Sequence, residues 1–425
     1  MIKSFMRSVS VWVFAVALVL AACAPTQEDT ETSGGGGEVP DQVVIGATLP
    51  LTGEEADAGN FYKEGYELAF EMKNDDGGLD MGGESVPVEL KLLDDTSDQA
   101  TAVNLAERLV NRDQVDFLLG TYSTTLVEAQ STVGEQNRIP YVNGGGAATA
   151  IYQRGYKWVF GSLAPIELLA RTQMEWIDEQ QKAGNLPDPA TIALLWENSS
   201  HGEDYRKGVQ DFADESDGSL EVVLDESFEL EGKDYSALLG KVKSADADLF
   251  LADAHLPDFI TMHRQYVTAG LCNDVITYGA RGVEKDAAKA LGPDNVSYIQ
   301  SAVWWNPQLG EQGGPNEQFI NAFKEKYGRD PEWYQAMGYE AARALFTAIE
   351  SAGSVDREAV RQALVDLRMD SIVPEGELTF PEESGYQAQY PFVVQQNQPD
   401  GSSPIIFPED LATGKGVAPN PNCQS

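Results

Sequence analysis

The chain is short of basic residues, cysteines and histidines. It has 29 lysines and arginines against 68 aspartates and glutamates, so its formal net charge is −39. So acidic a chain repels phosphate backbones, which argues against nucleic acid as a partner. Three histidines are too few for a zinc cluster without carboxylates, and no C-x-x-C spacing occurs. We therefore expect no metal and no cofactor.

Long apolar runs are also scarce. Beyond residue 22, no stretch is apolar for the roughly 20 residues that cross a bilayer. Enzyme signatures such as G-x-S-x-G and H-E-x-x-H are missing, and no nucleophile stands at a recognisable spacing from a base. We expect no catalytic activity. What remains is 425 residues with 42% hydrophobic content, enough for real cores and most simply two domains.

The first 22 residues have the layout of a secretory signal peptide. Lys3 and Arg7 give a positive start, residues 9–20 are almost wholly apolar, and small residues precede Cys23. This layout resembles the bacterial lipoprotein signal, in which the cysteine becomes the lipid-bearing first residue. The resemblance implies export and a lipid anchor at Cys23. The alternative is an uncleaved membrane anchor, for which the apolar run is short.

Residues 23–42 are polar, acidic and rich in glycine, which predicts a flexible tether. With Cys23 assigned to lipid, Cys272 and Cys423 remain as an even pair in an oxidising compartment. A disulfide between them and two free buried thiols are both open at this point.

From Val43 onward, short β-forming runs alternate with segments of helical periodicity. Buried short strands that alternate with helices predict parallel, doubly wound sheets, and two such series predict two α/β lobes. The Asp400-Gly401 pair between two strand-like runs predicts a hairpin. The predicted strands cover residues 43–47, 86–93, 117–119, 139–142, 192–196, 220–224, 249–252, 275–278 and 298–304, and the last predicted helices cover 315–327, 332–353 and 357–367.

Loops that follow strands are the first candidates for a site, because doubly wound sheets bind ligands beyond the carboxyl ends of their strands. Ser123 and Thr124 follow a predicted strand and precede a helix, where hydroxyls and free backbone N–H groups bind anions. An ordinary helix cap is the alternative. Gly144, Gly145 and Gly146 follow the next strand and permit a close approach of the backbone to a ligand. A flexible turn is the alternative there.

Five segments also share their order and spacing with one protein family. They are Ile45-Gly46-Ala47-Thr48-Leu49-Pro50-Leu51-Thr52-Gly53, Leu119-Gly120-Thr121-Tyr122-Ser123-Thr124, Pro140 to Gly146 with Gln153-Arg154-Gly155-Tyr156, Leu194-Leu195-Trp196 with Gly202, and Pro408-Glu409-Asp410-Leu411-Ala412-Thr413. Together they resemble branched-chain-amino-acid-type periplasmic binding proteins. The resemblance extends over nearly everything from Val43 onward.

The resemblance implies two doubly wound lobes of the type I periplasmic-binding-protein fold, joined by a hinge that the chain crosses three times. We place the crossings near Ala164, Asn306 and Phe380. Lobe 1 then comprises residues 43–163 and 306–379, and lobe 2 comprises residues 164–305 and 380–425. Both remaining cysteines fall in lobe 2, which makes their pairing easier.

The resemblance also implies a function. Such a protein is an extracytoplasmic solute-binding protein of an ABC importer, which closes over an amino acid or a related small carboxylate and delivers it to the permease and ATPase subunits. The lipid at Cys23 would hold it at the membrane, and we expect a monomer. The alternative is an exported ligand sensor of the same fold that acts through a signalling partner, because fold alone does not settle function.

Two loops match the ligand loops of the family. In the family, the loop that corresponds to Tyr122, Ser123 and Thr124 holds the ligand carboxylate. The family's loop that corresponds to the one with Gly145 offers a backbone carbonyl to the ligand ammonium and a hydroxyl to the ligand carboxylate. Gly146 matches the carbonyl position. Ala147 matches the hydroxyl position, so this chain lacks that hydroxyl.

Other positions depart from the family pattern. Arg281 stands where amino-acid binders often place an acid against the ligand ammonium, and His201 stands where an aromatic residue is usual. An arginine repels an ammonium and pairs with a carboxylate, although a surface salt bridge is its alternative role. Tyr122 and Trp304 are candidates for apolar walls, with strand core as the alternative for Trp304. The sequence thus predicts a carboxylate without an α-amino group, or an amino acid held differently.

The excess of acid generates a test of salt adaptation. Cleavage before Cys23 removes two positive charges and no acid, which leaves −41. Repulsion among these charges opposes the compact state, and molar salt screens it because the Debye length shrinks to about 3 Å. We expect the melting temperature of the mature chain to rise between low and molar salt in thermal unfolding. An unchanged melting temperature contradicts salt adaptation and leaves an ordinary acidic exported surface.

Overall fold

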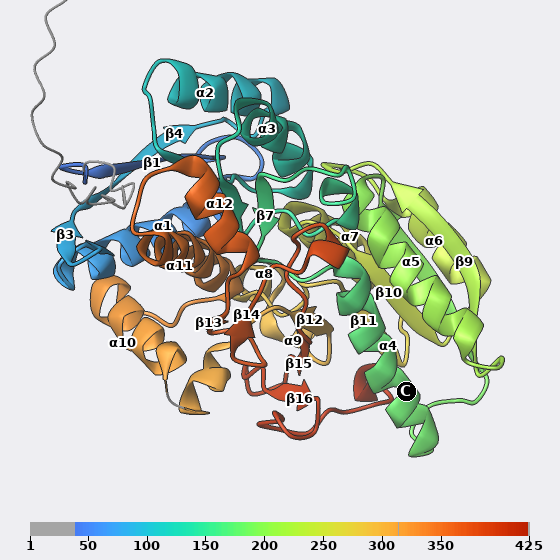
Figure 1. The fold of residues 1–425 in the computed structure, drawn as a ribbon. Helices are drawn as coiled ribbons and strands as arrows, with labels where there is room; N and C mark the ends of the chain where they lie inside the picture. The colour runs from blue at the N-terminus through green and yellow to red at the C-terminus, as the bar shows by residue number, and fades with distance from the viewer. Residues whose placement is uncertain (1–38, 313, 424–425) are drawn as a thin grey trace, which may run out of the picture. The chain divides into compact units, whose positions relative to one another are not determined.

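Two β-sheets organise the computed structural model, which describes residues 39–312 and 314–423 (Figure 1). The predicted signal peptide, the predicted lipidation site Cys23 and most of the predicted tether lie outside the described residues. Within the described part of the chain, no helix is both long and apolar enough to cross a membrane.

The first sheet has five strands, and all of its neighbours are parallel, as predicted. Its order is β4 (Val88–Asp94), β1 (Val43–Leu49), β5 (Phe117–Leu119), β6 (Tyr141–Asn143) and β7 (Val159–Gly161). Side chains of β5 alternate between two cores: Phe117 and Leu119 share one with helices α1 (Ala56–Asp75) and α11 (Trp333–Ala352), whereas Leu118 shares the other with α2 (Gln99–Asn111) and α3 (Thr124–Asn137). Both faces are covered, which confirms the doubly wound prediction.

The second sheet repeats this arrangement. Its order is β9 (Leu220–Phe228), β8 (Ala190–Glu197), β10 (Leu249–Asp253), β11 (Val275–Tyr278), β12 (Gln300–Val303), β15 (Val393–Gln396) and β16 (Ile405–Phe407). Leu249 and Leu251 pack in a core with α4 (Ile166–Lys182) and α5 (Ser200–Glu215), whereas Phe250 and Ala252 pack in a core with α6 (Ser236–Ala245) and α7 (Leu256–Thr268). β9 to β12 pair in parallel, and β15 and β16 form the antiparallel hairpin predicted around Asp400-Gly401.

The chain passes between the sheets three times: between β7 and α4, between β12 and α11, and between β14 and β15. The lobe boundaries given above remain a prediction. The other elements are β2 (Leu79–Met81), β3 (Glu84–Val86), α8 (Lys285–Leu291), α9 (Pro293–Val296), α10 (Pro315–Tyr327), α12 (Arg357–Val365), β13 (Met369–Asp370), β14 (Glu377–Leu378) and the 3₁₀ turns η1 (Thr149–Ile151), η2 (Pro307–Gln312), η3 (Glu382–Ser384) and η4 (Pro421–Cys423).

Several predicted strands differ from the observed ones by a few residues at their ends, and one is divided in two. The run over residues 86–93 divides at Pro87, where β3 ends and β4 begins one residue later. Proline lacks the N–H that a strand ladder uses. β3 instead pairs back on β2 through Gly82 and Gly83, whose φ values of 70° and 95° suit a tight hairpin turn.

Cys272 and Cys423 form a disulfide, which is one of the two alternatives that the sequence left open. Their Cα atoms lie 5.3 Å apart, and the bond joins positions 151 residues apart. It thereby ties the C-terminal turn η4 to the loop that precedes β11 in the second sheet.

We expect the Cys272→Ser/Cys423→Ser double variant to melt several degrees below the wild type. A crosslink over so long a loop restricts the unfolded chain and contributes about 3–5 kcal/mol. Calorimetry with and without reductant measures the effect, and reductant should leave the double variant unchanged. Equal melting temperatures for the reduced and oxidised wild type contradict this role.

Candidate functional site

The site lies at the carboxyl ends of the central strands of both sheets. In each sheet, the strand that comes first in the sequence lies between the second and the third. In such sheets the loops diverge between the first and third strands, and ligands bind there. Glu55 follows β1 and Ser123 follows β5 in the first sheet, while His201 follows β8 and His255 follows β10 in the second.

Buried hydrogen bonds fix the loop that leads into α3. The Oδ2 atom of Asp95 accepts from the Oγ1 atoms of Thr48 at 2.8 Å and Thr121 at 2.6 Å. Asp95 is fully buried. These groups come from the ends of the neighbouring strands β4, β1 and β5. Their hydrogen bonds therefore hold in place the loop from which Ser123 and Thr124 lead into α3.

Eight of the nine predicted ligand-binding residues line one cavity. The cavity is small, about 10 Å³, which is close to what the centre of one water molecule needs. A larger solute therefore enters only when the loops separate or their side chains rotate. The eight residues are Tyr122, Ser123, Thr124, Gly145, Ala147, His201, Arg281 and Trp304, and Leu163, His255 and Trp333 complete the lining.

Gly146 is the predicted residue that the lining omits. Its carbonyl oxygen accepts a hydrogen bond from the Oη atom of Tyr152 at 2.7 Å. A side chain at this position would collide with Val127 and Ile151, with contacts of 2.7 to 2.9 Å. The structure thus gives Gly146 a packing role beside the cavity, and the carbonyl that the family resemblance assigned to a ligand ammonium has a partner within the chain.

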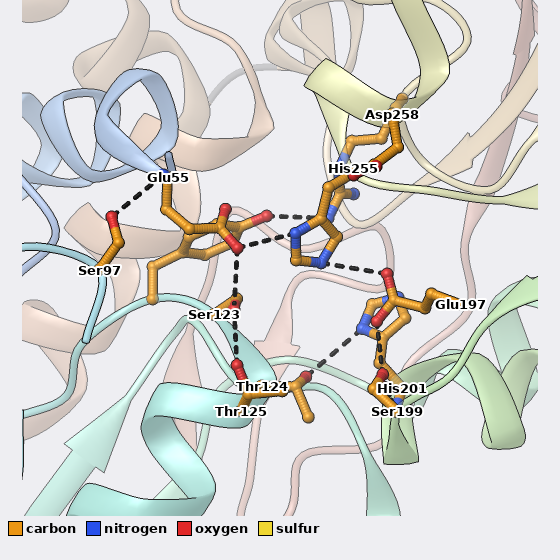
Figure 2. A network of polar contacts seen from close by, with 12 residues as sticks. Glu55, Ser97, Ser123, Thr124, Thr125, Glu197, Ser199, His201, His255 and Asp258 are labelled. Carbon is orange, nitrogen blue, oxygen red and sulfur yellow. Dashed lines mark hydrogen bonds and ion pairs between the residues drawn. The ribbon is translucent and has the colours of Figure 1, made fainter. Parts of the chain in front are cut away.

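His255 is held between two carboxylates that come from different sheets (Figure 2). Its Nδ1 atom lies 2.8 Å from Oε1 of Glu55, and its Nε2 atom lies 3.2 Å from Oε2 of Glu197. Two carboxylates at these distances, one beside each ring nitrogen, favour the doubly protonated ring. The arrangement therefore favours an imidazolium at this position.

The environment of His255 agrees with that charge. Burial acts to lower the pKa of His255, but the charges of Glu197 and Glu55 outweigh it and raise the pKa to about 10. Burial likewise acts to raise the pKa of Glu55, and the charge and hydrogen bond of His255 outweigh it, so the pKa is lowered. The positive charge of Arg281 acts to lower the pKa of both His255 and Glu55, which disfavours the charged form of the histidine and favours the charged form of the glutamate. Burial raises the pKa of the neighbouring Asp258.

His201 joins the two sheets at a second point. Its Nε2 atom lies 3.3 Å from Oδ2 of Asp253, at the end of β10, and its Nδ1 atom lies 3.4 Å from the Oγ1 atom of Thr124. Ser199 caps α5 and accepts from the backbone N–H groups of His201 and Gly202. The cap turns His201 toward α3.

Arg281 is buried, so the surface salt bridge considered for it is wrong. Its side chain follows β11 and is 2% exposed. Its Nη2 atom donates to Oη of Tyr122 at 2.9 Å, which links the sheets a third time. The guanidinium lies 4.9 Å from the ring centroid of Trp333 and 5.6 Å from that of Tyr334. Trp304, buried after β12, packs against Trp333 with the two rings tilted by 39° and donates from Nε1 to the carbonyl of Ala164.

Sequence reasoning missed Glu55, Glu197, His255, Trp333 and Glu284. His255 carried a usable signal, because it stands two residues after a correctly predicted strand. Glu197 carried the same signal, because it directly follows the strand predicted over residues 192–196. Trp333 and Glu284 carried none, since Trp333 reaches the cavity from a helix far along the chain and Glu284 is tied to the site by the hydroxyl of Tyr334, at 2.6 Å. Across residues 39–312 and 314–423, no group of three or more histidine, cysteine, aspartate or glutamate side chains is arranged to hold a metal ion.

Comparisons with known proteins agree on one family. The sequence model of the family described as periplasmic binding protein matches residues 42–402. The leucine-, isoleucine-, valine-, threonine-, and alanine-binding protein of Pseudomonas aeruginosa is 27% identical over 363 residues, covering 85% of this chain and 91% of that protein. A leucine-binding protein from Thermotoga maritima has a TM-score of 0.73 at 22% identity, covering 85% of this chain and 97% of the other. A solute-binding protein of an ABC transporter from R. palustris, solved with benzoate, has a TM-score of 0.73 at 20% identity, covering 89% and 98%.

The charge on His255 makes stability depend on pH. The pKa of His255 is higher in the folded chain, about 10, than in the unfolded chain, near 6.5. Its stabilisation is therefore complete below about pH 6.5 and is lost as pH rises through 10. We expect His255→Gln to cost about 3–5 kcal/mol at neutral pH, because it leaves buried carboxylates unpaired, and to flatten the decline of stability toward alkaline pH.

Denaturant unfolding at several pH values measures both effects. His263→Gln is the matched control, because burial lowers the pKa of His263 to about 4 and this side chain stays neutral across the range. Parallel pH profiles for wild type and His255→Gln contradict a buried imidazolium.

Proposed function

This chain belongs to the periplasmic binding protein family, and from that premise we propose that it is the solute-binding lipoprotein of an ABC importer. The family predicted from the sequence is confirmed. Its members bind solutes for transporters and are not enzymes. The finer parts of the proposal are the lipid anchor, the class of solute and delivery to a membrane permease.

The observation that carries the proposal is a cavity enclosed by loops of two separate sheets. Contacts between the sheets surround it: Glu55 with His255, Tyr122 with Arg281, and Tyr334 with Glu284. A further contact runs from Thr149 to Asp204, whose Oδ2 atom accepts from the Oγ1 and the backbone N–H of Thr149 at 2.7 Å each. Such contacts favour the closed arrangement, and a solute that adds to them shifts the population further toward closure.

The solute class follows from the relatives and from the lining. The Pseudomonas aeruginosa relative is named for five amino acids, and the R. palustris structure holds benzoate. All of these carry a carboxylate. In this chain the N-terminus of α3, the hydroxyls of Ser123 and Thr124 and the guanidinium of Arg281 border one cavity. Helix N-termini and arginine both bind carboxylates, which supports capture of an amino acid or a related small carboxylate.

Anchoring explains how capture leads to transport. A lipid at Cys23 and a glycine-rich tether keep a monomer within reach of the permease and its ATPase, at high effective concentration. The closed arrangement is then the form that the permease recognises.

Thermal shift with leucine, glutamate and benzoate tests capture. A solute at about 100 times its dissociation constant adds about 2.7 kcal/mol of stability, so at least one of these should raise the melting temperature. Thr124→Ala removes a cavity hydroxyl and should weaken that solute about 5- to 30-fold. Thr132→Ala, on the same helix and hydrogen-bonded to the carbonyl of Ala129, is the control. Capture is contradicted when none of the three solutes shifts the unfolding curve.

Detergent partitioning of the chain expressed in a bacterial host tests the anchor. Wild type should enter the detergent phase and carry a lipid-modified N-terminal peptide in mass spectrometry. Cys23→Ser should stay in the aqueous phase, while Cys272→Ser, which leaves the lipidation site intact, should partition like the wild type. An unmodified Cys23 in the mature wild type overturns the anchor but not the capture of solute.

A further inference from the structure

Arg281 is a buried cation whose hydrogen-bonding capacity is largely unused. Its Nη2 atom has Tyr122 as its partner, but Nε and Nη1 find no hydrogen-bond acceptor among the described residues. The side chain is 2% exposed and borders the cavity. A buried guanidinium without a counter-charge is costly, so this position is suited to an anion that arrives with the solute.

The nearest carboxylate does not fill that role. Glu284 lies three residues along, with its Oε1 atom 3.7 Å from Nε of Arg281, beyond hydrogen-bond distance. This Oε1 atom instead accepts from Oη of Tyr334. Burial raises the pKa of Glu284 to about 8 despite Arg281, so the carboxyl is mostly uncharged at neutral pH. Arg281 therefore lacks a full counter-ion within the chain.

The acids that could receive an ammonium group do not border the cavity. Glu55 and Glu197 lie beside the imidazolium of His255, and Asp253 lies beside His201. An α-ammonium group placed in the cavity would find no carboxylate among the lining residues, and it would meet the repulsion of Arg281 and His255. The lining thus offers an open partner for a negative group and none for a positive one.

The rest of the wall is aromatic. Tyr122, Trp304 and Trp333 border the cavity with their rings, and the guanidinium of Arg281 lies 4.9 Å from the ring centroid of Trp333. The contact with Trp333 restricts the guanidinium, and Nε and Nη1 remain as donors that a carboxylate oxygen can accept from. Aromatic rings suit an apolar solute body.

We propose that the solute is a small apolar carboxylate without an α-ammonium group, held by Arg281 through its carboxylate. This inference rests on the proposed function, and it names the class of solute captured. Arg281 is the residue that sets this specificity, since it supplies the charge that the carboxylate requires and that an ammonium avoids.

Pairs of solutes that differ only in the amino group test the proposal directly. The probes are 4-methylpentanoate against leucine, and 3-phenylpropanoate against phenylalanine, in isothermal titration calorimetry at neutral pH. The carboxylate of each pair should bind at least about 10-fold more tightly than its amino acid, which corresponds to about 1.4 kcal/mol. Benzoate should bind and benzamide, which lacks the charge, should not.

Arg281→Gln should weaken the best carboxylate about 10- to 100-fold, and Arg281→Lys, which keeps the charge without the planar guanidinium, should recover part of the loss. Arg171→Gln is the control, because Arg171 pairs with Glu215 on the outer faces of α4 and α5, remote from the cavity lining. Unchanged circular dichroism spectra and melting curves show that the variants are folded, and the solute pairs test the wild type even where a variant fails to fold.

The outcomes separate the two levels of the proposal. Amino acids that bind as tightly as their carboxylate partners, or affinity that Arg281→Gln leaves unchanged, overturn the solute class while the capture function stands. Failure of every probe, amino acids included, overturns the solute class and counts against capture itself.

Discussion

The structure of the site depends on one constraint: charges buried between the two sheets must be paired. The imidazolium of His255 lies between Glu55 of the first sheet and Glu197 of the second, and its charge lowers the pKa of Glu55 against the effect of burial. A buried charge that loses its partner costs several kcal/mol. The approach of the two sheets is therefore coupled to the charge on one side chain, and the loops that carry these groups are held in register with one another.

The fold explains why those loops meet. In each sheet the strands run parallel, so their carboxyl ends gather at one edge, and the strand order makes the loops diverge near the middle. Helices cover both faces of each sheet, so the loops at the carboxyl edge are the part of each sheet that a solute can contact. Once the two edges face each other, the side chains that follow strands of both sheets enclose one cavity. Capture of a solute then follows from a change in how the edges approach, with no chemistry on the solute.

Sequence patterns predicted much of the fold because the decisive signals are local. β11 and α10 have the predicted bounds, α12 begins at the predicted residue 357, and α3 begins at Thr124, close to where a helix was predicted to start. Strands of three residues carry too little pattern, which is why β7 was missed. The loops of the site were predicted from strand ends and family resemblance. The pairing of Glu55 with His255 could not be predicted, because the two residues lie 200 positions apart and on different sheets, and no local spacing encodes the distance between them.

The class of solute that we propose depends on what Arg281 binds. A crystal structure of the protein soaked with benzoate measures this most directly. Of the charged groups that border the cavity, this guanidinium keeps two buried nitrogens without a hydrogen-bond acceptor among the described residues. We expect the carboxylate of benzoate within hydrogen-bond distance of Nε or Nη1 of Arg281, with the ring against Tyr122, Trp304 or Trp333. A carboxylate bound elsewhere in the chain, with Arg281 unchanged, would contradict it.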